Sequence, residues 1–406
     1  MKIVRIIARL NVGGPARHVV WLTKRLHTDE FKSTLMSGAV PDGEEDMSYF
    51  AEQHGISPLY IEEMSRELSP KDIVSLWKIY RHIVRQQPDV IHTHTAKAGT
   101  LGRTAAFAYK WITPRTLLGR PRNVKVVHTF HGHVFHSYYS PRKTSIFRTI
   151  ERVLARLATD RIIVISEQQL REINGDNRIG RPEQFSVIPL GMDFDHTSGA
   201  EEGFLRKEAK AGPDDILIAF VGRLTEIKDI PLLLAAFSDA LPLGGESMRL
   251  VVIGDGTLRD ALERATVELG VESKVTFLGN RQDVGKLVAD ADIVALSSLN
   301  EGTPLSLIEA MAAGKAVIST TVGGVIDLLG AKVEEREGFA VYERGVGVAT
   351  RAPIDFAKGL IYLAKNERLR KSLGSSAETF VRENYSIERL ERDIVSLYRE
   401  LMPSDS

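Results

Sequence analysis

Apolar and polar positions alternate in two patterns along nearly the whole chain. Short apolar runs bounded by Gly, Pro and Asn predict buried strands, as in residues 1–10, 123–130 and 214–221. Longer stretches with apolar residues three or four apart predict amphipathic helices, as in 69–87 and 140–160. Strands that alternate with helices are typical of βαβ units and a parallel sheet. The chain is therefore predicted to be α/β, with two Rossmann-like domains of similar size.

A change in composition marks the expected domain boundary. Gly, Ser, Glu and Lys dominate between about 195 and 210, directly before the apolar run that opens the second half. We expect an N-terminal domain over 1–195, a second domain over 196–380 and a C-terminal helical segment over 381–406.

Composition limits the classes of protein that need to be considered. The chain has 406 residues, of which 43% are hydrophobic and 26% charged, as in soluble globular proteins. It has no cysteine, which excludes a disulfide framework and fits a reducing compartment. Charges interrupt the apolar residues of the N-terminus, which argues against a signal peptide, and no apolar run reaches about 18 residues. A cytoplasmic protein is predicted.

The net charge is zero, but the two halves differ in sign. Residues 1–195 hold 28 Lys and Arg against 20 Asp and Glu, and the remainder holds the opposite excess. A basic half indicates an anionic partner such as lipid head groups, a pyrophosphate-linked acceptor or nucleic acid, although solvated helix faces explain it equally well. The segment 106–125 mixes basic residues with Trp111, Ile112, Leu117 and Leu118, as membrane-surface segments do. We expect no specific nucleic-acid binding.

Residues 297–324 read as loop, helix, strand and loop, with two carboxylates around the helix. Thr303 is a suitable N-cap, Pro304 suits the first helical position, and Gly314 ends the pattern. The amides at the start of this helix form an anion site. Glu301 and Glu309 lie on either side of it and can accept hydrogen bonds from sugar hydroxyls. This layout fits a nucleotide-sugar; two solvated glutamates on a surface helix are the simpler alternative.

Two further strand ends carry phosphate-binding features. Arg223 and Lys228 lie five apart in a loop after a strand, where two cations can hold and neutralise a diphosphate. Gly13 and Gly14 join the first strand to a helix and allow close backbone approach, without forming a G-x-G-x-x-G dinucleotide motif.

Histidines gather at two other strand ends. His92 and His94 are two apart on a strand and face the same side, as metal ligands can, but no third ligand is near in sequence. Hydrogen bonding in a loop near the acceptor is the favoured interpretation, and no metal site is predicted. The run from 123 ends in His131, Gly132 and His133, at the end of a strand where α/β folds place chemistry.

Three of these stretches resemble the retaining GT-B glycosyltransferases of sequence family four, the bacterial group 1 glycosyltransferases. They are SSLNEGTPLSLIEAMAAGKAVIST at 297–320, FVGRLTEIKD at 220–229 and the strand end at 124–133. The resemblance implies a GT-B fold with two Rossmann-like domains facing a central cleft. It also implies that the first domain binds the acceptor, that the second binds the donor, and that the last helix crosses back to the first domain.

The resemblance also implies roles for individual residues. Glu309 binds the ribose, Glu301 contacts the transferred sugar, and His131, rather than His128 or His133, lies against that sugar. Arg223 and Lys228 take the diphosphate. The remaining donor-binding positions are Gly13, Gly14, Gly222, Gly302, Thr303, Pro304, Leu305 and Ser306. Asp229 replaces the usual glycine, and Asp327 stands where glutamate is commoner, which leaves the donor sugar open.

The predicted activity is transfer of a sugar from a nucleotide-diphospho-sugar to a hydroxyl, and the resemblance implies that the anomeric configuration is retained. A UDP-sugar donor is favoured, as is a lipid-linked acceptor in surface polysaccharide or glycolipid synthesis at the inner face of the membrane. The resemblance implies that no metal or cofactor is needed, and the Asp193–Asp195 pair, which forms a D-x-D, lies at the domain junction. The alternatives are a sugar-nucleotide epimerase of the same fold and a non-catalytic protein that binds a nucleotide-sugar or a polyanion.

Overall fold

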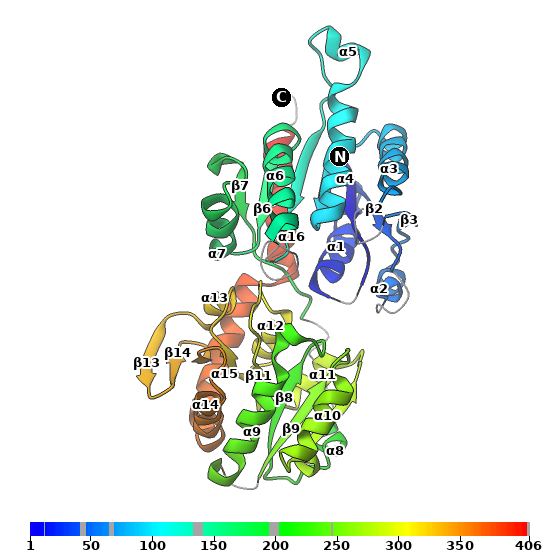
Figure 1. The fold of residues 1–406 in the computed structure, drawn as a ribbon. Helices are drawn as coiled ribbons and strands as arrows, with labels where there is room; N and C mark the ends of the chain where they lie inside the picture. Colours follow the sequence, from blue (N-terminus) through cyan, green and yellow to red (C-terminus); the bar gives the residue numbers. More distant parts are fainter. Residues whose placement is uncertain are drawn as a thin grey trace. The chain divides into compact units, whose positions relative to one another are not determined.

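A computed structural model of the chain describes residues 1–11, 13–40, 46–64, 69–132, 141–194, 203–244 and 247–403 (Figure 1). The chain divides into two compact units. Unit 1 consists of Met1–Gly191 and Ile387–Ser406, and unit 2 consists of Met192–Ser386. Within the described residues, none of the helices is both long and apolar enough to cross a bilayer.

Unit 1 is built on a seven-stranded sheet in the order β3-β2-β1-β4-β5-β6-β7, and every pairing in it is parallel. Its strands are β1 Lys2–Ile7, β2 Lys32–Gly38, β3 Leu59–Ile61, β4 Val90–His94, β5 Lys125–Thr129, β6 Arg161–Val164 and β7 Phe185–Val187. The strand order reverses between β1 and β4. Because ligands in open α/β sheets bind outside the carboxyl ends of strands at such a reversal, this point is the expected site of unit 1.

Helices cover both faces of this sheet. They are α1 Gly14–Arg25, α2 Ser48–Gln53, α3 Asp72–Gln86, α4 Ala96–Trp111, α5 Pro114–Leu117, α6 Pro141–Leu157, α7 Glu167–Leu170 with the π-helical turn η1 Arg171–Asp176, the 3-10 turn η2 Pro182–Gln184, and α16 Ile387–Leu401. One buried apolar cluster joins β1, β4 and β5 to α3 and α4, and a second joins β1 and β2 to α1 and α2. Burial of these two faces provides the main driving force for the layered fold.

A buried ion pair links two helices of unit 1. Arg103 on α4 donates two hydrogen bonds to the Glu151 carboxylate on α6, at 2.6 and 2.7 Å, and its Nε also donates to the Gly99 carbonyl. Both side chains are almost completely buried. A charge in such a place is tolerated only when it is paired, so each residue depends on the other.

Unit 2 has an eight-stranded sheet in the order β10-β9-β8-β11-β12-β15-β14-β13. Its strands are β8 Ile216–Val221, β9 Met248–Ile253, β10 Val275–Gly279, β11 Ile293–Leu296, β12 Ala316–Thr320, β13 Lys332–Arg336, β14 Phe339–Tyr342 and β15 Gly345–Val348. The first six strands in this order are parallel, and β14 and β13 add an antiparallel edge. Here the order reverses between β8 and β11.

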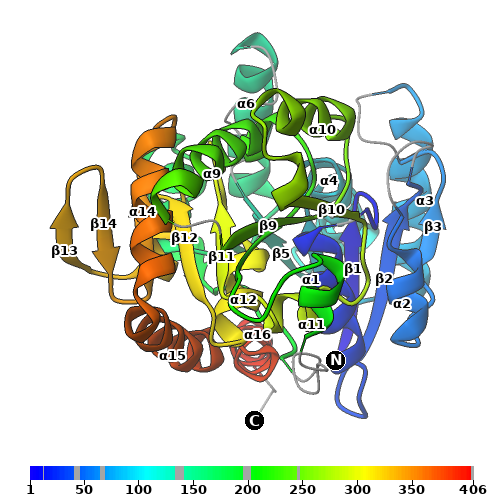
Figure 2. The ribbon, with the colours of Figure 1, turned by 90° about the horizontal axis from the view of Figure 1, so that it is seen from below.

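The helices of unit 2 are α8 Phe204–Glu208, α9 Ile230–Gly244, α10 Arg259–Glu268, α11 Val284–Ala289, α12 Leu305–Ala312, α13 Val325–Leu329, α14 Pro353–Lys365 and α15 Glu367–Asn384, with 3-10 turns η4 Glu226–Lys228 and η5 Glu272–Lys274. The connection from β8 to β9 and the connection from β11 to β12 run in opposite directions across the sheet. Because such crossover connections are right-handed, α9 and α12 lie on opposite faces of the sheet. Figure 2 shows α9 beside α14. The alternation read from the sequence thus gives the predicted α/β class with two Rossmann-like sheets.

Candidate functional site

The loops that follow β8 and β11 meet where the strand order of unit 2 reverses. The Ser297 hydroxyl donates to the Lys228 carbonyl at 2.8 Å, and the Leu299 amide donates to the Ile227 carbonyl at 2.8 Å. These bonds bring the segment 222–228 against the segment 297–301. Two loops that sequence analysis singled out separately therefore form one site.

Lys228 and Glu301 form an ion pair in this site. The Lys228 Nζ lies 2.5 Å from Glu301 Oε1, and the Ser298 hydroxyl donates to the same oxygen at 2.6 Å. Their side chains are 18% and 12% exposed. The sequence offered no cation close to Glu301, because its partner lies 73 residues upstream. The pair holds an ammonium and a carboxylate side by side at a solvent-accessible edge of the sheet.

The turn after Lys228 explains the departure at Asp229. Asp229 has φ 43° and ψ 48°, in the left-handed region that glycine adopts most easily. Aspartate is among the residues that tolerate this conformation, so the turn is retained without glycine. Burial raises the pKa of its carboxyl. Arg223, in the same loop, has an exposed side chain that is accessible to a ligand.

Helix α12 begins one residue later than predicted. The predicted N-cap was Thr303, but Pro304 occupies that position, with φ −74° and ψ 113°, and Leu305 is the first helical residue. Thr303 is buried, and Gly324 packs against its side chain. This tertiary packing overrides the local capping preference. The predicted end is confirmed: Gly314, at φ +67°, donates to Met311, and Lys315 donates to Ala310, which is the Schellman arrangement.

The glycine pair after β12 holds the loop before α12. The Gly324 amide donates to the Gly302 carbonyl at 2.7 Å. A Cβ on Gly324 would lie 2.1 Å from that carbonyl oxygen, so only glycine fits. The contact fixes the backbone that leads from Glu301 into the helix.

The other predicted donor residues lie around the same point. Pro304 is buried, and Leu305 and Ser306 are half-buried on the first turn of α12. Glu309 is half-buried on the second turn of α12. Gly222 directly follows β8, and its amide donates to the Ile253 carbonyl at 3.0 Å. Unit 2 therefore places two carboxylates, two cations and a helix N-terminus along one sheet edge.

Unit 1 brings three histidines together at its own strand reversal. His18 lies on α1, which follows β1; His94 ends β4; and His131 follows β5. His94 Nδ1 and His131 Nε2 are 2.9 Å apart, and the His18 ring centroid lies 4.8 Å from that of His131. One ring nitrogen from each of the three lies within 4.8 Å of the others, which is close enough to hold a metal ion.

A fourth histidine, His92, packs against His94 of this cluster. Its Nδ1 lies 2.6 Å from the Tyr398 hydroxyl on α16, and its Nε2 lies 2.7 Å from the Thr129 hydroxyl. Its ring lies 4.2 Å from that of His94. Both of its nitrogens are thus engaged, and His92 has a structural role.

Burial keeps these imidazoles neutral. Burial is the main cause that lowers the pKa of His131 to about 3. It also lowers the pKa of His18, His92 and His94 well below the usual value, and neighbouring histidines and Arg5 add to that effect. A neutral imidazole offers a lone pair to a ligand. His131 itself is half-buried, and Gln169 donates to the carbonyl of the adjacent Gly132 at 2.9 Å.

The other predicted residues of unit 1 that the structure describes lie outside the three-histidine cluster. Gly13 is the N-cap of α1 and Gly14 is its first residue. His128 is buried, and its Nδ1 lies 2.8 Å from the Thr93 hydroxyl, so it does not join the three-histidine cluster. His133 and Asp195 lie outside the described residues.

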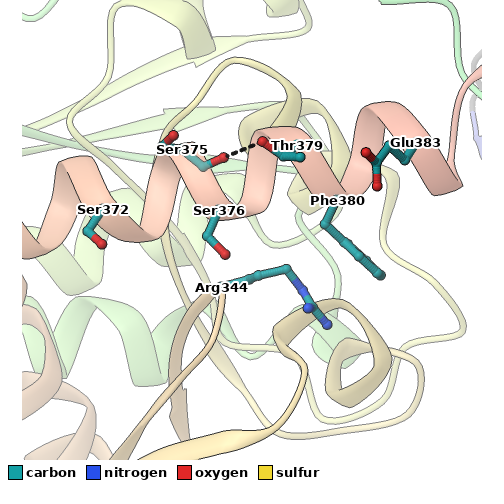
Figure 3. A pocket seen from close by; sticks show the side chains of 7 residues that line it. All are labelled: Arg344, Ser372, Ser375, Ser376, Thr379, Phe380 and Glu383. Carbon is teal, nitrogen blue, oxygen red and sulfur yellow. Dashed lines mark hydrogen bonds between the residues drawn. The ribbon is translucent and has the colours of Figure 1, made fainter.

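A surface hollow in unit 2 lies apart from these residues. Figure 3 shows it between α15 and the turn that precedes β15, lined by Arg344, Ser372, Ser375, Ser376, Thr379, Phe380 and Glu383. Arg344 stacks on the Phe380 ring at 3.7 Å and donates to the carbonyls of Asp327 and Leu328. Its guanidinium joins α13 to α15, and the hollow contains none of the predicted donor residues.

Comparison with known proteins gives a consistent result in both halves. The model of the group 1 glycosyl transferases matches residues 202–380, and that of glycosyltransferase family 4 matches residues 12–196. An Escherichia coli UDP-Gal:alpha-D-GlcNAc-diphosphoundecaprenol alpha-1,3-galactosyltransferase is 29% identical over 276 residues, covering 66% of this chain and 67% of that protein. The putative glycosyltransferase EpsD of Bacillus subtilis is 25% identical and is matched over 83% of each chain.

Solved structures share the fold. Anabaena Alr3699/HepE in complex with UDP has a TM-score of 0.77 at 20% identity, covering 98% of this chain and 100% of that one. The two Rossmann-like sheets and these likenesses define a glycosyltransferase of the GT-B class, which acts on nucleotide-sugar donors. Within that class, the chain belongs to the group 1 glycosyl transferases of family 4.

Proposed function

We propose that this protein transfers a sugar from a UDP-sugar to a hydroxyl acceptor, with retention at the anomeric carbon and without a metal ion. The observation that carries the proposal is the Lys228–Glu301 pair, placed at the strand reversal of unit 2 and directly before α12. This arrangement provides a cation for a phosphate and a carboxylate for sugar hydroxyls at one sheet edge.

The leaving diphosphate would be received by three groups. The amides of Leu307 and Ile308 donate to the Pro304 carbonyl, and those of Leu305 and Ser306, at the start of α12, would donate to an incoming anion. Lys228 and the exposed Arg223 add positive charge. Charge develops on the diphosphate as the bond to the sugar breaks, so these donors stabilise the transition state more than the ground state. Fixed cations in this position make a divalent metal unnecessary.

The two glutamates would bind the sugars at either end of the donor. Glu309 on α12 accepts hydrogen bonds from the ribose, and Glu301 accepts them from the transferred sugar. His131 would contact the transferred sugar through a neutral imidazole. A donor phosphate oxygen takes the acceptor proton as the new bond forms on the face that the diphosphate leaves. That geometry gives retention.

The names of relatives support the proposed donor nucleotide and acceptor. The Escherichia coli relative is named for UDP-Gal and a diphosphoundecaprenol-linked sugar, and HepE was solved with UDP and with UDP-glucose. We therefore propose UDP as the nucleotide and a lipid-linked saccharide as the acceptor, in surface polysaccharide or glycolipid synthesis.

A hydroxyl acceptor on a lipid requires contact with a membrane, and unit 1 has a suitable surface. Leu117 and Leu118 at the end of α5 are 91% and 78% exposed, and Ile112 just before α5 is 70% exposed. The exposed Arg120 follows them. Exposed apolar side chains next to a basic residue are typical of a segment that inserts into an anionic lipid surface. We propose peripheral attachment at the inner face of the membrane through this segment.

The donor assignment is tested with a panel of UDP-, GDP- and ADP-sugars, measuring binding and slow hydrolysis without acceptor. Wild type is compared with Glu309→Ala and Lys228→Ala. The exposed Glu268→Ala and Lys207→Ala serve as matched controls for loss of charge. We expect a UDP-sugar to bind and to be hydrolysed, and only the site variants to lose both. If no nucleotide-sugar binds, or if site and control variants behave alike, the donor site is wrong.

Three further measurements test the stereochemistry, the epimerase alternative and the membrane segment. Transfer to a lipid-linked acceptor, with the anomeric configuration read by NMR, supports the proposal when the configuration is retained. Conversion of the donor to an epimer without acceptor would replace it with the epimerase. Sedimentation with anionic vesicles tests the membrane segment. Leu117→Ser with Leu118→Ser should release the protein, and Val267→Ser, at a 63% exposed apolar position of unit 2, should not.

A further inference from the structure

The three-histidine cluster of unit 1 contains more ring nitrogens without a hydrogen-bond partner than contact with a sugar would use. Both ring nitrogens of His18, Nε2 of His94 and Nδ1 of His131 are buried and have no hydrogen-bond partner among the described residues. A buried polar atom without a partner costs free energy, so a native site with several of them needs an explanation. The cluster consists of imidazoles only, and that chemistry selects a particular kind of ligand.

We propose that His18, His94 and His131 bind a transition-metal ion of the Zn²⁺ type. Imidazole nitrogen is a preferred ligand of such ions, and three histidines with an open fourth position for water form a known type of zinc site. The ligand nitrogens lie within 4.8 Å of one another. Bond lengths of about 2.0–2.1 Å in a tetrahedral site need separations of roughly 3.4 Å, so side-chain rotations that bring the rings closer complete the site.

The fold already places the three ligands. Each comes from a different strand end or helix around the reversal between β1 and β4, so no two of them depend on the same loop. His94 and His131 already contact each other at 2.9 Å. The Gly132 carbonyl next to His131 is held by Gln169. The scaffold therefore restricts the ligands before an ion arrives, which lowers the entropy cost of binding.

The surroundings also define which ions are excluded. The Arg5 guanidinium, bound to Ser33 and to the Tyr398 hydroxyl, adds positive charge near the cluster. Mg²⁺ and Ca²⁺ prefer oxygen ligands, and none of the three residues provides one. Only an ion that gains strongly from nitrogen coordination overcomes the repulsion from Arg5. The site is thus selective for Zn²⁺, Ni²⁺ or Cu²⁺ over the alkaline-earth ions.

Metal binding has a consequence that rests on the proposed function. The proposed contact of His131 with the transferred sugar uses the same imidazole that would coordinate the ion. A bound ion would hold that ring in place and occupy the space in front of it. We therefore expect Zn²⁺ to inhibit transfer reversibly, and metal-free protein to be the active form.

Binding is measured first, on the full chain without any nucleotide-sugar, by competition between the protein and a chromophoric zinc chelator. Each of the variants His18→Gln, His94→Gln and His131→Gln should bind Zn²⁺ at least ~100-fold more weakly than wild type. Even residues that only hydrogen-bond to a metal ligand contribute about 10–100-fold to metal affinity. His27→Gln, at an exposed histidine of the same unit, should leave it unchanged. Equal affinity in all four variants, or no binding by wild type, overturns the proposal.

A spectroscopic measurement protects the test against variants that fail to fold. X-ray absorption of the wild-type zinc complex should show three imidazole ligands at about 2.0–2.1 Å; one imidazole or none overturns the proposal. Inhibition is measured separately, with Mg²⁺ as the control ion and recovery after addition of EDTA. If Zn²⁺ binds as expected but no donor is used under any condition, the proposed function fails and the metal site stands. If transfer occurs and Zn²⁺ does not bind, only the metal site fails.

Discussion

The Lys228 ammonium and the Glu301 carboxylate are 2.5 Å apart, although they follow different strands of unit 2. Each of the two charges neutralises the other. A donor that places phosphate near Lys228 and hydroxyls near Glu301 would give each group a further partner. The pair is therefore prepared for a ligand that carries both kinds of group.

Glu301→Gln should reduce turnover far more than stability. The amide keeps the shape of the side chain and can still accept from Ser298, but it loses the negative charge. Loss of one charged transition-state contact costs about 10²-fold in kcat, whereas a partly exposed ion pair contributes only about 1 kcal/mol to folding. UDP release and urea unfolding measure the two effects. A variant with wild-type kcat would place Glu301 away from the reacting sugar.

Gly324→Ala should disturb the donor loop. The new Cβ would lie 2.1 Å from the Gly302 carbonyl oxygen and 3.0 Å from the Thr303 hydroxyl, so the backbone before α12 must move. We expect a loss of about 1–3 kcal/mol in the free energy of unfolding together with weaker UDP binding.

Gly212→Ala is the matched control for this variant. At Gly212 the nearest atom to the new Cβ is 3.8 Å away, so its stability and UDP affinity should stay at wild-type levels. Calorimetry of unfolding and of UDP binding gives both quantities. Identical results for the two alanine variants would show that the contact of Gly324 with Gly302 has no role.

Glu151→Leu should be among the most destabilising single substitutions in unit 1. It leaves the Arg103 guanidinium buried and without its partner carboxylate, which costs about 3–5 kcal/mol. Combining it with Arg103→Met should recover much of that loss, because two apolar side chains of similar volume can replace a buried ion pair. Chemical unfolding of the single and double variants measures the difference. Additive losses in the double variant would contradict the interpretation.

The stability of unit 1 should fall as the pH falls below about 6.5. Burial lowers the pKa of His128 well below its usual value. Between the two pKa values the unfolded chain binds more protons than the folded chain, so the contribution is complete above the unfolded pKa and is lost on acidification. The slope is up to ~1.4 kcal/mol per pH unit for one such histidine.

Urea unfolding at several values between pH 7 and pH 5 measures this slope. His128→Gln should reduce it, because glutamine takes up no proton, while His27→Gln at an exposed position should leave it as it is. A wild-type free energy of unfolding that stays constant over this interval would contradict the role of the buried histidine.

The sequence predicted the fold class because the relevant information is periodic and local. Strands in parallel sheets are continuous apolar runs, and the helices between them show one apolar face, so both could be recognised one segment at a time. The start of α12 shows the limit of that approach. A capping preference is local, whereas the burial of Thr303 against Gly324 depends on a turn 21 residues later.

The functional residues show the same limit more clearly. The ionic partner of Glu301 and the third histidine beside His94 and His131 could not be found by spacing, since each lies far away along the chain. A signal was present in the sequence. The Lys228–Glu301 pair and the three histidines all lie at or beyond the ends of strands that are neighbours in their sheets. A strand order assumed from the Rossmann-like class, combined with the residues after each strand, would have found the three histidines.

The division of the chain has a consequence for synthesis on the ribosome. Unit 2 is one continuous segment, whose first and last residues, Met192 and Ser386, are paired by a backbone bridge. Unit 1 begins at residue 1 but needs Tyr398 of α16 to engage Arg5 and His92. While the ribosome is still making unit 2, unit 1 lacks those hydrogen bonds and the final helix. We therefore expect the N-terminal half to be the last part of the nascent protein to reach its native state, and to depend most on chaperones until then.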